Sequence, residues 1–283
     1  MRLIIGTTLG ELLDFDLNNL SCPNNQKKLT NKGILGIQFI DNMLYVSSNK
    51  EILVCDPIRF SVRHSYKNRH AEYHDLLVEK NRLLVANTAN NSVEEFTRRL
   101  GRVRIHKIDP PSPNRPIIKK LNYNHINSIC RNDDEYYVGL NWLTQKQYGP
   151  SGVCITDLEF NEKRRVEVGW EIHCPRIIGE SLYLVCGSSA GIKTVRHPPE
   201  AGLMRVNGDF AGKLIYKHHP NIFCKNFTYS ANKNNFYLMG SDSALRGNRG
   251  LSDGHIIVLN KNYDKIFYSR LKGHGGFTSC EIV

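Results

Sequence analysis

The fold is decided by the last seven residues, Phe277-Thr278-Ser279-Cys280-Glu281-Ile282-Val283, taken together with Arg2-Leu3-Ile4-Ile5-Gly6 at the other end of the chain. Both stretches are rich in the apolar residues of buried β-strands. Each is part of a unit that occurs in full elsewhere in the sequence. If the two terminal strands pair in one sheet, the chain closes into a ring, and closure removes exposed strand edges at the seam.

The complete units share a strand-like run of aliphatic and aromatic residues. It recurs at residues 43–48, 82–87, 135–140, 181–186 and 235–240, and residues 2–6 form a further copy. A second apolar run that ends in Asp or Asn follows most copies, at residues 12–16, 52–56, 153–157, 203–207 and 256–260. Equivalent positions lie roughly 40 to 55 residues apart, the period of a four-stranded propeller blade. The sequence therefore predicts an all-β, six-bladed β-propeller whose last blade is closed by pairing of the N- and C-terminal strands.

We expect residues 1–283 to form a single propeller domain. The first complete blade covers residues 33–65, and the later inner strands begin at His74, His125, His173, near Phe227 and at Phe277. Three blades carry insertions between their second and third strands, at residues 141–152, 187–202 and 241–254. These loops share a face with the beginnings of the inner strands. Because long loops on a rigid scaffold commonly carry binding groups, we expect a site on that face.

Composition and terminal pattern indicate a cytoplasmic protein without a membrane span. No apolar run reaches about 18 residues, and Met1 leads into a strand without a signal-peptide pattern. The eight cysteines include no Cys-x-x-Cys pair, and most lie inside predicted strands. We therefore expect buried, reduced thiols.

The net charge of +11 predicts an anionic partner. The basic residues are scattered, with local clusters at residues 98–104 and 163–165, and no aromatic residues are interleaved with them. That pattern argues against nucleic acid. An anionic small-molecule substrate is the preferred interpretation, and a glycan is also compatible with the charge.

Histidines stand at or near the beginnings of four predicted inner strands: His74, His125, His173 and His274. Inner strands of a propeller converge on its central channel, so these imidazoles are candidates for one shared metal site. Imidazole suits iron, zinc or copper. A structural role for each histidine, or shared contact with a substrate without metal, is the alternative interpretation.

Two further groups are candidates for catalysis or substrate binding. Arg176 follows Pro175 in a predicted inner strand, where a buried guanidinium needs a carboxylate such as Asp75 or an anion in the channel. Asp75 is also placed to orient a histidine ring or to add an oxygen ligand. The inserted loops contribute four candidate substrate-binding residues: Trp142, Tyr148, Arg246 and Arg249.

Two segments carry a family resemblance: His74-Asp75-Leu76-Leu77 followed by residues 83–87, and His173-Cys174-Pro175-Arg176 followed by residues 182–191. They resemble an uncharacterised bacterial family of six-bladed propellers and, more distantly, the strictosidine synthase-like and gluconolactonase-like propellers. Gluconolactonase-like proteins hold a divalent cation with Glu, Asn and Asp, whereas histidines stand at the corresponding positions here. The four-histidine iron site of carotenoid oxygenases is similar in ligand chemistry, although its scaffold has seven blades.

These observations lead to a functional hypothesis with two rivals. The hypothesis is an enzyme for a small, anionic metabolite that uses a histidine-coordinated divalent metal at the mouth of the channel, with Arg176 positioning the acidic group. The first rival is a non-enzymatic scaffold that binds a protein or glycan partner. The second is nucleic-acid binding through the net charge, which predicts steep salt dependence.

Overall fold

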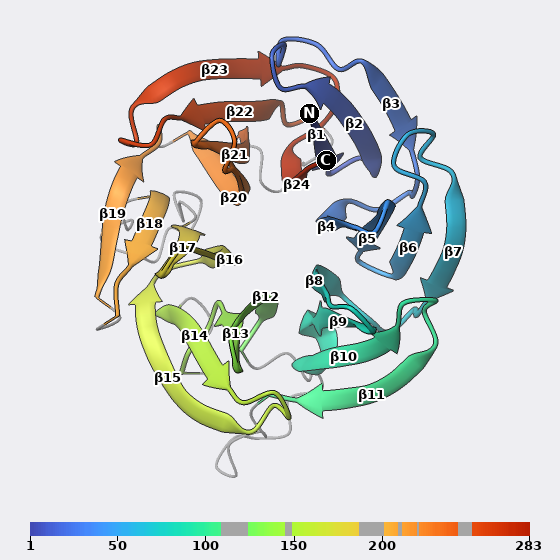
Figure 1. The fold of residues 1–283 in the computed structure, drawn as a ribbon, viewed down its shortest axis with the longest axis vertical. Helices are drawn as coiled ribbons and strands as arrows, with labels where there is room; N and C mark the ends of the chain where they lie inside the picture. Colours follow the sequence, from blue (N-terminus) through green and yellow to red (C-terminus); the bar gives the residue numbers. More distant parts are fainter. Residues whose placement is uncertain (109–123, 145–148, 187–200, 209–210, 220, 243–250) are drawn as a thin grey trace.

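Six four-stranded antiparallel sheets stand around a central axis as the blades of a propeller (Figure 1). The computed structural model describes residues 1–108, 124–144, 149–186, 201–208, 211–219, 221–242 and 251–283. Within this part of the chain, no helix is long and apolar enough to cross a membrane. The fold class predicted from the sequence is confirmed.

Each blade is numbered by the order in which its inner strand occurs in the chain. Blade 1 contains β4 (Ile34–Ile40), β5 (Met43–Ser48), β6 (Glu51–Cys55) and β7 (Val62–Lys67). Blade 2 contains β8 (Tyr73–Val78), β9 (Arg82–Asn87), β10 (Ser92–Thr97) and β11 (Arg102–Lys107), with a 3-10 turn, η1 (Thr88–Asn90), between β9 and β10. Blade 3 contains β12 (Ile126–Asn132), β13 (Glu135–Leu140), β14 (Ser151–Thr156) and β15 (Glu162–Gly169).

The remaining blades follow the same pattern, except that the sixth combines the two chain ends. Blade 4 contains β16 (Ile172–Ile178), β17 (Ser181–Cys186), β18 (Gly202–Val206) and β19 (Gly212–Lys217). Blade 5 contains β20 (Ile222–Ser230), β21 (Asn235–Asp242), β22 (Gly254–Leu259) and β23 (Lys265–Leu271). Blade 6 contains β24 (Phe277–Ile282), β1 (Arg2–Thr7), β2 (Glu11–Asp16) and β3 (Asn25–Lys28). The inner strand of blade 5 thus begins at Ile222, and the expected start near Phe227 was wrong.

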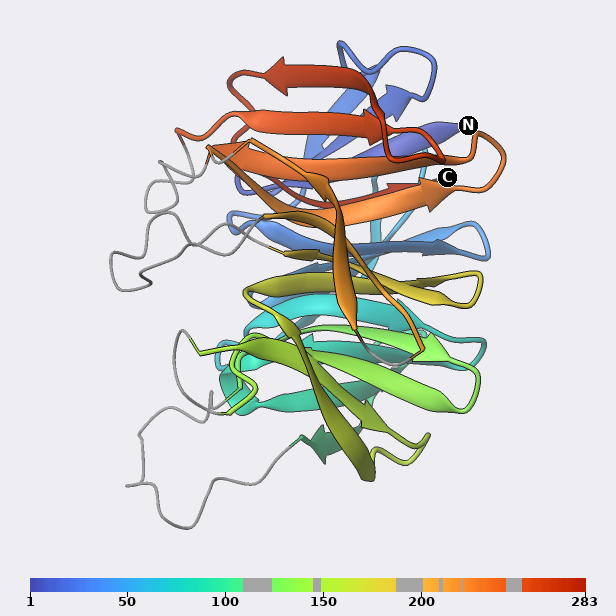
Figure 2. The same ribbon diagram turned by 90° about the vertical axis from the view of Figure 1, so that its left-hand side faces the viewer.

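The seam of the ring is the pairing of β1 with β24. Their register places Leu3 opposite Ile282 and Ile5 opposite Cys280. The amide of Arg2 donates to the carbonyl of Val283, and the amide of Val283 donates back to the carbonyl of Arg2, both at 2.9 Å. Both termini consequently lie on one face of the disc, which we call the termini face (Figure 2). The inner strands begin on the opposite face, which we call the start face.

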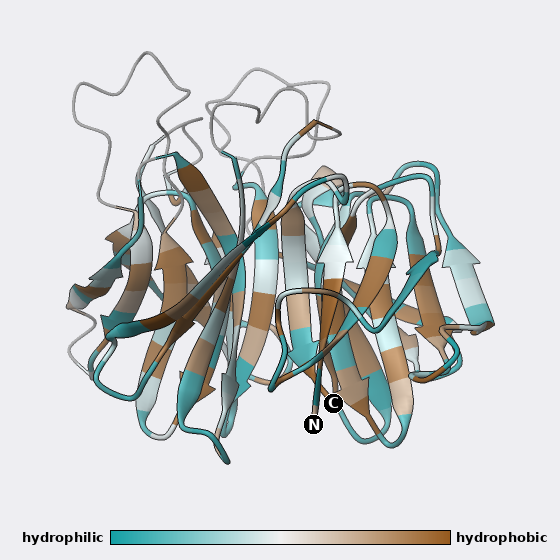
Figure 3. Cartoon of the chain, turned by 90° about the horizontal axis from the view of Figure 1, so that it is seen from above, coloured by the Kyte–Doolittle hydropathy of each residue, from teal (hydrophilic) through white to brown (hydrophobic). Residues whose placement is uncertain are grey.

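The core consists of layers between neighbouring blades. On β5, Leu44 and Val46 pack towards blade 6, whereas Tyr45 packs towards blade 2. Alternate residues of a strand point to opposite faces, and here both faces are buried. This explains why the second and third strands read as continuous apolar runs, which appear as brown bands through the middle of the disc (Figure 3). Of the eight cysteines, all of them free, seven are buried in these layers and Cys22 is exposed.

Every inner strand has a β-bulge at the same level, close to the start face. The ladder skips one residue between Ile34 and Gly36, Tyr73 and Asp75, Ile126 and Ser128, and Cys224 and Asn226, and in blade 6 the skipped residue is Thr278. In blade 4 the ladder is interrupted between His173 and Arg176, where Cys174 and Pro175 lie opposite Leu184 alone. A bulge leaves one residue outside the ladder and re-aims its side chain. The six bulges therefore determine which side chains point into the channel.

Side-chain hydrogen bonds connect neighbouring blades at this level. The hydroxyl of Thr278 in blade 6 lies within hydrogen-bond distance of the carbonyl oxygens of Gly6 and of Ile34 in blade 1. In the same way, Thr88 donates to the carbonyl of Ile126, and Asn127 donates to the carbonyl of Ile172 at 2.7 Å. Equivalent carbonyls at the beginnings of three inner strands are thus held by the preceding blade.

We expect Thr278→Val to lower the free energy of unfolding by about 1–3 kcal/mol, because it leaves a buried carbonyl without its donor while preserving side-chain shape. Thr228→Val is the matched control: Thr228 is half-buried on β20 and has no side-chain hydrogen bond within the described residues. We expect the control to change stability by no more than about 0.5 kcal/mol. Urea unfolding measures both values. Equal losses for the two variants would contradict a role for Thr278 at the seam.

Candidate functional site

The channel opens on the start face into a small cavity, which we call the channel mouth. Its volume is about 20 Å³. All six inner strands contribute to its lining, which consists of Leu35, His74, Asp75, Asn127, His173, Cys174, Lys225, Asn226 and Thr278. A polar cavity of this size holds about one water molecule. As lined by the described residues, the channel mouth is thus smaller than a metabolite.

The bulges show which of the predicted histidines are equivalent. His74, Asn127 and His173 each follow the first paired residue of their inner strand and line the channel mouth, so Asn127 and not His125 is the equivalent in blade 3. His125 precedes β12 and has a left-handed backbone conformation, with φ of 52°. Its ring nevertheless contacts those of His74 and Trp142, with centroids 5.4 and 4.9 Å apart. The expectation that His125 occupies the position equivalent to His74 was wrong by two residues.

The structure does not assemble the four histidines around one point suited to a metal. His74 and His173 line the channel mouth, but His274 pairs with Glu11, with 3.6 Å between Nδ1 and Oε2. Among the described residues, no group of three or more His, Cys, Asp or Glu is placed to hold a metal ion. Lys225 also lines the cavity, and its Nζ lies 5.4 Å from the centroid of the Phe223 ring. An iron, zinc or copper site stays a prediction that this geometry does not favour.

Deeper in the channel, Arg176 lies between acidic groups from other blades. Its Nη1 is 3.6 Å from Oδ2 of Asp75 in blade 2, and Glu281 of blade 6 also acts on it electrostatically. Burial raises the pKa of Asp75, and Arg176 opposes that rise. The pKa of Glu281 is likewise raised, to about 7, chiefly by burial. The charge of Arg176 lowers this pKa, and the charge of Asp75 raises it further. The three groups form a charge cluster that connects blades 2, 4 and 6.

Of the predicted substrate-binding residues, only Trp142 lies within the described residues, where it packs on His125. Tyr148, Arg246 and Arg249 lie outside them. The described residues on the start face thus bring together His74, His125 and Trp142 through ring contacts. Asp75 and Arg176 lie together below them in the channel.

A larger hollow, which the sequence did not predict, lies between blades 4 and 5. We call it the blade pocket, and its volume is about 600 Å³. Blade 4 and the link that follows it contribute Tyr216, His219 and Asn221. Blade 5 contributes Ile222 from β20, Asp242 from β21, His255 and Ile257 from β22, and Lys265, Tyr268 and Arg270 from β23. This volume is large enough for a small organic molecule.

Three side chains in the blade pocket form one hydrogen-bonded chain. The hydroxyl of Tyr268 is 2.9 Å from Nδ1 of His255, and Nε2 of His255 is 3.0 Å from Oδ1 of Asp242. The ionised Asp242 only accepts hydrogen bonds, so Nε2 carries the proton and Nδ1 is left to accept from Tyr268. The other oxygen of Asp242 accepts the amide of Asp253 at 2.9 Å. The carboxylate is thus fixed on both sides.

The local fold explains this alignment. His255 and Tyr268 extend from adjacent paired strands, with Ile257 opposite Tyr268 and His255 opposite Arg270, and their rings are stacked with centroids 5.9 Å apart. Gly254, immediately before His255, lets β22 approach the seam, because a Cβ atom there would lie 2.2 Å from the Phe277 ring. Arg270 is held in turn by Asp253, at 2.8 Å from Nε to Oδ2.

The pKa shifts suit a neutral histidine between a protonated tyrosine and an ionised aspartate. Burial lowers the pKa of His255, although Asp242 opposes that effect. Burial raises the pKa of Tyr268. Burial alone would raise the pKa of Asp242 as well, but its hydrogen bonds from the Asp253 amide and His255, with the nearby cations, hold that pKa below its usual value. Near neutral pH, these directions keep Tyr268 protonated, His255 neutral and Asp242 ionised.

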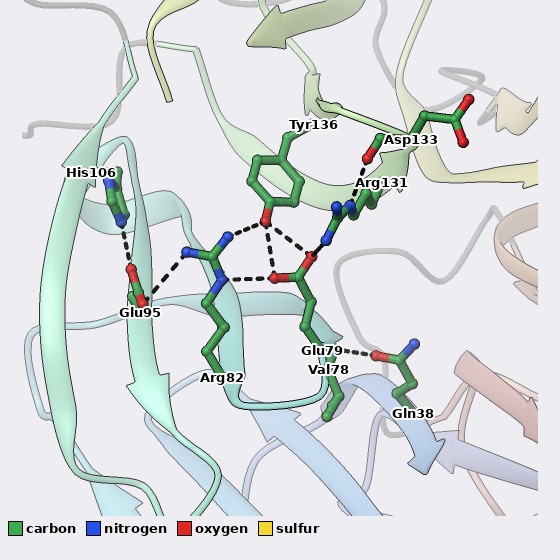
Figure 4. Close-up of polar contacts among 9 residues, drawn as sticks. All are labelled: Gln38, Val78, Glu79, Arg82, Glu95, His106, Arg131, Asp133 and Tyr136. Atoms are coloured by element: carbon green, nitrogen blue, oxygen red, sulfur yellow. Dashed lines mark hydrogen bonds and ion pairs between the residues drawn. The ribbon is translucent and has the colours of Figure 1, made fainter. Parts of the chain in front are cut away.

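Another polar cluster, on the termini side of blades 2 and 3, has a structural character (Figure 4). Glu79 pairs with Arg82 at 2.7 Å and with Arg131 at 2.8 Å, and the hydroxyl of Tyr136 donates to its carboxylate. Arg82 also approaches Glu95, which is bonded to His106 at 3.0 Å. The charges compensate one another across the blade interface. This cluster fastens blades 2 and 3 together.

Comparison with known proteins supports the scaffold and no more. No family model matches the chain, and no curated protein sequence is significantly similar to it. A protein of unknown function from Bacteroides caccae has a similar structure, with a TM-score of 0.73 and 9% identity over 99% of this chain and 97% of that chain. A chain of a nidogen–laminin complex is similar with a TM-score of 0.66 and 10% identity, covering 99% of this chain and 97% of that chain. The WD40 domain of Neurospora crassa Pan2 is similar with a TM-score of 0.58 and 11% identity, covering 96% of this chain and 75% of that chain. The TM-scores show a shared propeller architecture, and identities of 9–11% limit the likeness to the fold. The resemblance to strictosidine synthase-like proteins stays a prediction.

We expect Glu281→Gln to flatten the pH dependence of stability. A carboxyl group whose pKa is raised to about 7 in the folded protein, against about 4.3 in an unfolded chain, binds more protons folded than unfolded. Its contribution to stability is thus present in acid and is lost as the pH rises through 7. Urea unfolding of both proteins between pH 5 and 8 measures the difference.

Glu180→Gln, at an exposed turn position, is the control and should follow the unsubstituted protein at each pH. If Glu281→Gln and the unsubstituted protein lose stability in parallel as the pH rises, the channel carboxyl does not titrate as described.

Proposed function

We propose that this propeller is a small-molecule enzyme that transfers a proton at Tyr268 in the blade pocket. The observation that carries the proposal is the unbroken hydrogen-bonded chain of Tyr268, His255 and Asp242, which opens onto a hollow of about 600 Å³. A titratable pair in a cleft, with pKa values shifted by burial and by a partner, is typical of catalytic sites. The predicted small-molecule activity is kept, but its location moves from the channel to the edge between two blades.

The proton transfer can be written without a metal. An acidic proton of the substrate passes to Oη of Tyr268 while the phenolic proton passes to Nδ1 of His255. His255 becomes an imidazolium ion, and Asp242 stabilises that charge through Nε2. In the reverse direction, His255 returns its proton to Oη of Tyr268 while Tyr268 gives its own proton to the product. Such general acid–base assistance contributes roughly 10²- to 10⁴-fold to a rate.

The cations of the pocket favour a substrate that carries an acidic group. Lys265 lies over the Tyr268 ring, with 6.0 Å from its Nζ to the ring centroid, and Arg270 lines the same hollow. Arg270 is oriented by Asp242 and Asp253, so its guanidinium has a fixed position when the ligand arrives. The net charge of +11 attracts anions towards the protein as a whole.

An arylsulfonyl fluoride tests the activation of Tyr268 without knowledge of the substrate. Attack by Oη forms an O–S bond and releases fluoride, while His255 takes the phenolic proton. We expect Tyr268 to be labelled about 10-fold faster than the other tyrosines. His255→Gln and Asp242→Asn should each slow that labelling by about 10-fold, because general-base assistance is lost. Peptide mass spectrometry gives the rate at each tyrosine.

His219→Gln is the matched control, since His219 lines the blade pocket outside the hydrogen-bonded chain, and it should leave the labelling rate unchanged. If Tyr268 reacts no faster than other tyrosines, or if His255→Gln does not slow it, the acid–base proposal fails. The rival of a non-enzymatic scaffold would then be the better account of this fold.

A further inference from the structure

The positive charge of the protein is concentrated on the outermost strand of each blade. These six strands form what we call the rim, visible as the outer circle of the ring (Figure 1). The rim strands contain fourteen lysines and arginines: Lys27, Lys28, Arg63, Lys67, Arg102, Arg104, Lys107, Lys163, Arg164, Arg165, Lys213, Lys217, Lys265 and Arg270. Their only acidic residues are Glu162 and Glu167. The rim therefore has a net charge of +12, against +11 for the whole chain, and the remainder is close to neutral.

Protection of strand edges explains only part of this pattern. Charged side chains on an edge strand prevent pairing with other molecules, but either sign of charge serves that purpose. Here one sign predominates in all six strands. Some rim cations have acidic partners, as in the pairs Arg63–Asp56 and Arg104–Glu159. Such exposed pairs are weak and exchange readily with another anion.

Other rim cations have no acidic partner within the described part of the chain. They are Lys28 on β3, Arg102 and Lys107 on β11, Lys213 on β19 and Lys265 on β23. They lie on four of the six rim strands. The rim thus presents cations at several places around the ring and suits an extended ligand that carries many negative charges.

The shape of the rim favours an acidic polysaccharide over nucleic acid. Duplex DNA is commonly read by a helix or ribbon placed in a groove, and the rim is a set of flat, twisted edge strands. Single strands are held by stacking on exposed aromatic rings, but Tyr268 is the one aromatic side chain among the large, exposed apolar residues of the described rim. A chain of sugars with carboxylate or sulfate groups needs spaced cations and hydrogen-bond donors, which the rim supplies.

We propose that the rim of blades 4 and 5 is a docking surface for a linear acidic polysaccharide, one unit of which enters the blade pocket. Lys213 and Lys217 lie on β19, and Lys265 and Arg270 on β23. Lys265 and Arg270 also line the pocket beside Tyr268. A polymer held by the rim therefore passes the hydrogen-bonded chain. Entry of one polymer unit into the blade pocket rests on the proposed function, whereas docking on the rim does not.

Heparin, a sulfated polysaccharide, is the probe for the docking surface. We expect calorimetric titration to detect binding at 50 mM salt and at least 10-fold weaker binding at 200 mM salt, because the contacts are exposed and screened. The triple variant Lys213→Glu, Lys217→Glu, Lys265→Glu should lower the affinity by at least 10-fold. The control Lys32→Glu, Lys80→Glu, Lys261→Glu changes the net charge equally at exposed positions outside the six rim strands and should lower affinity by less than 3-fold.

Three results would overturn docking of a polysaccharide on this surface. The first is no heparin binding at 50 mM salt, and the second is an equal loss of affinity in the two triple variants. The third is tighter binding of single-stranded or duplex DNA than of heparin at the same salt, which would make nucleic acid the partner.

The path of the polymer past the pocket is tested separately from the acid–base chemistry. Saturating heparin should slow arylsulfonyl fluoride labelling of Tyr268 by at least 5-fold, and Tyr268→Phe should leave heparin affinity within 2-fold. Unchanged labelling in the presence of bound heparin would overturn entry of the polymer into the pocket. Loss of accelerated labelling in His255→Gln concerns the proposed function alone, so the two failures are distinguishable.

Discussion

The pairing of β1 with β24 is the interaction on which the rest of the structure depends. The apolar layers of the described residues lie between neighbouring blades, so a ring that is not closed would expose one apolar face at each end. At the seam, Ile4 and Leu12 of blade 6 pack with Ile34 of blade 1, and Leu3 packs with Phe277 and with Met239 of blade 5. Residues more than 270 positions apart must therefore meet before the core is complete. The entropic cost of closing so long a loop grows only slowly with its length, and the buried apolar surface offsets it.

Closure also explains why the channel is narrow at the level of its described lining. The inner strands converge, and their bulges turn polar side chains inward until only about 20 Å³ remains. Below that level, Arg176 compensates Asp75 and Glu281 across the axis. Buried ion pairs add little net stability but are costly to break, so this cluster fixes the relative position of three blades. The larger hollow lies instead where two blades diverge towards the rim, at the edges of β19 and β23.

The fold followed from the sequence because burial of both strand faces produces repeated apolar runs, and these remain visible despite different loops. The incomplete units at the two ends also predicted the shared blade. The site was harder to predict because no residue pattern marks where an inner strand begins or bulges. The shared residue type therefore aligned His125 with His74, two residues before the true equivalent, Asn127. The blade pocket depends on contact between two different blades, which no repeat encodes. One signal was present: His255 is a polar residue inside the apolar run of β22, and a buried histidine needs a partner.

Hydrogen exchange at the backbone amides of β1 and β24 tests the closed ring most directly, because amides that open only on global unfolding report the full stability of the fold. The account predicts that the paired amides of these terminal strands are protected to within about 10-fold of those in β13, the second strand of an internal blade. Exchange of β1 and β24 as fast as that of the exposed link at residues 18–24 would contradict the closed ring, and with it the placement of the channel, the blade pocket and the rim.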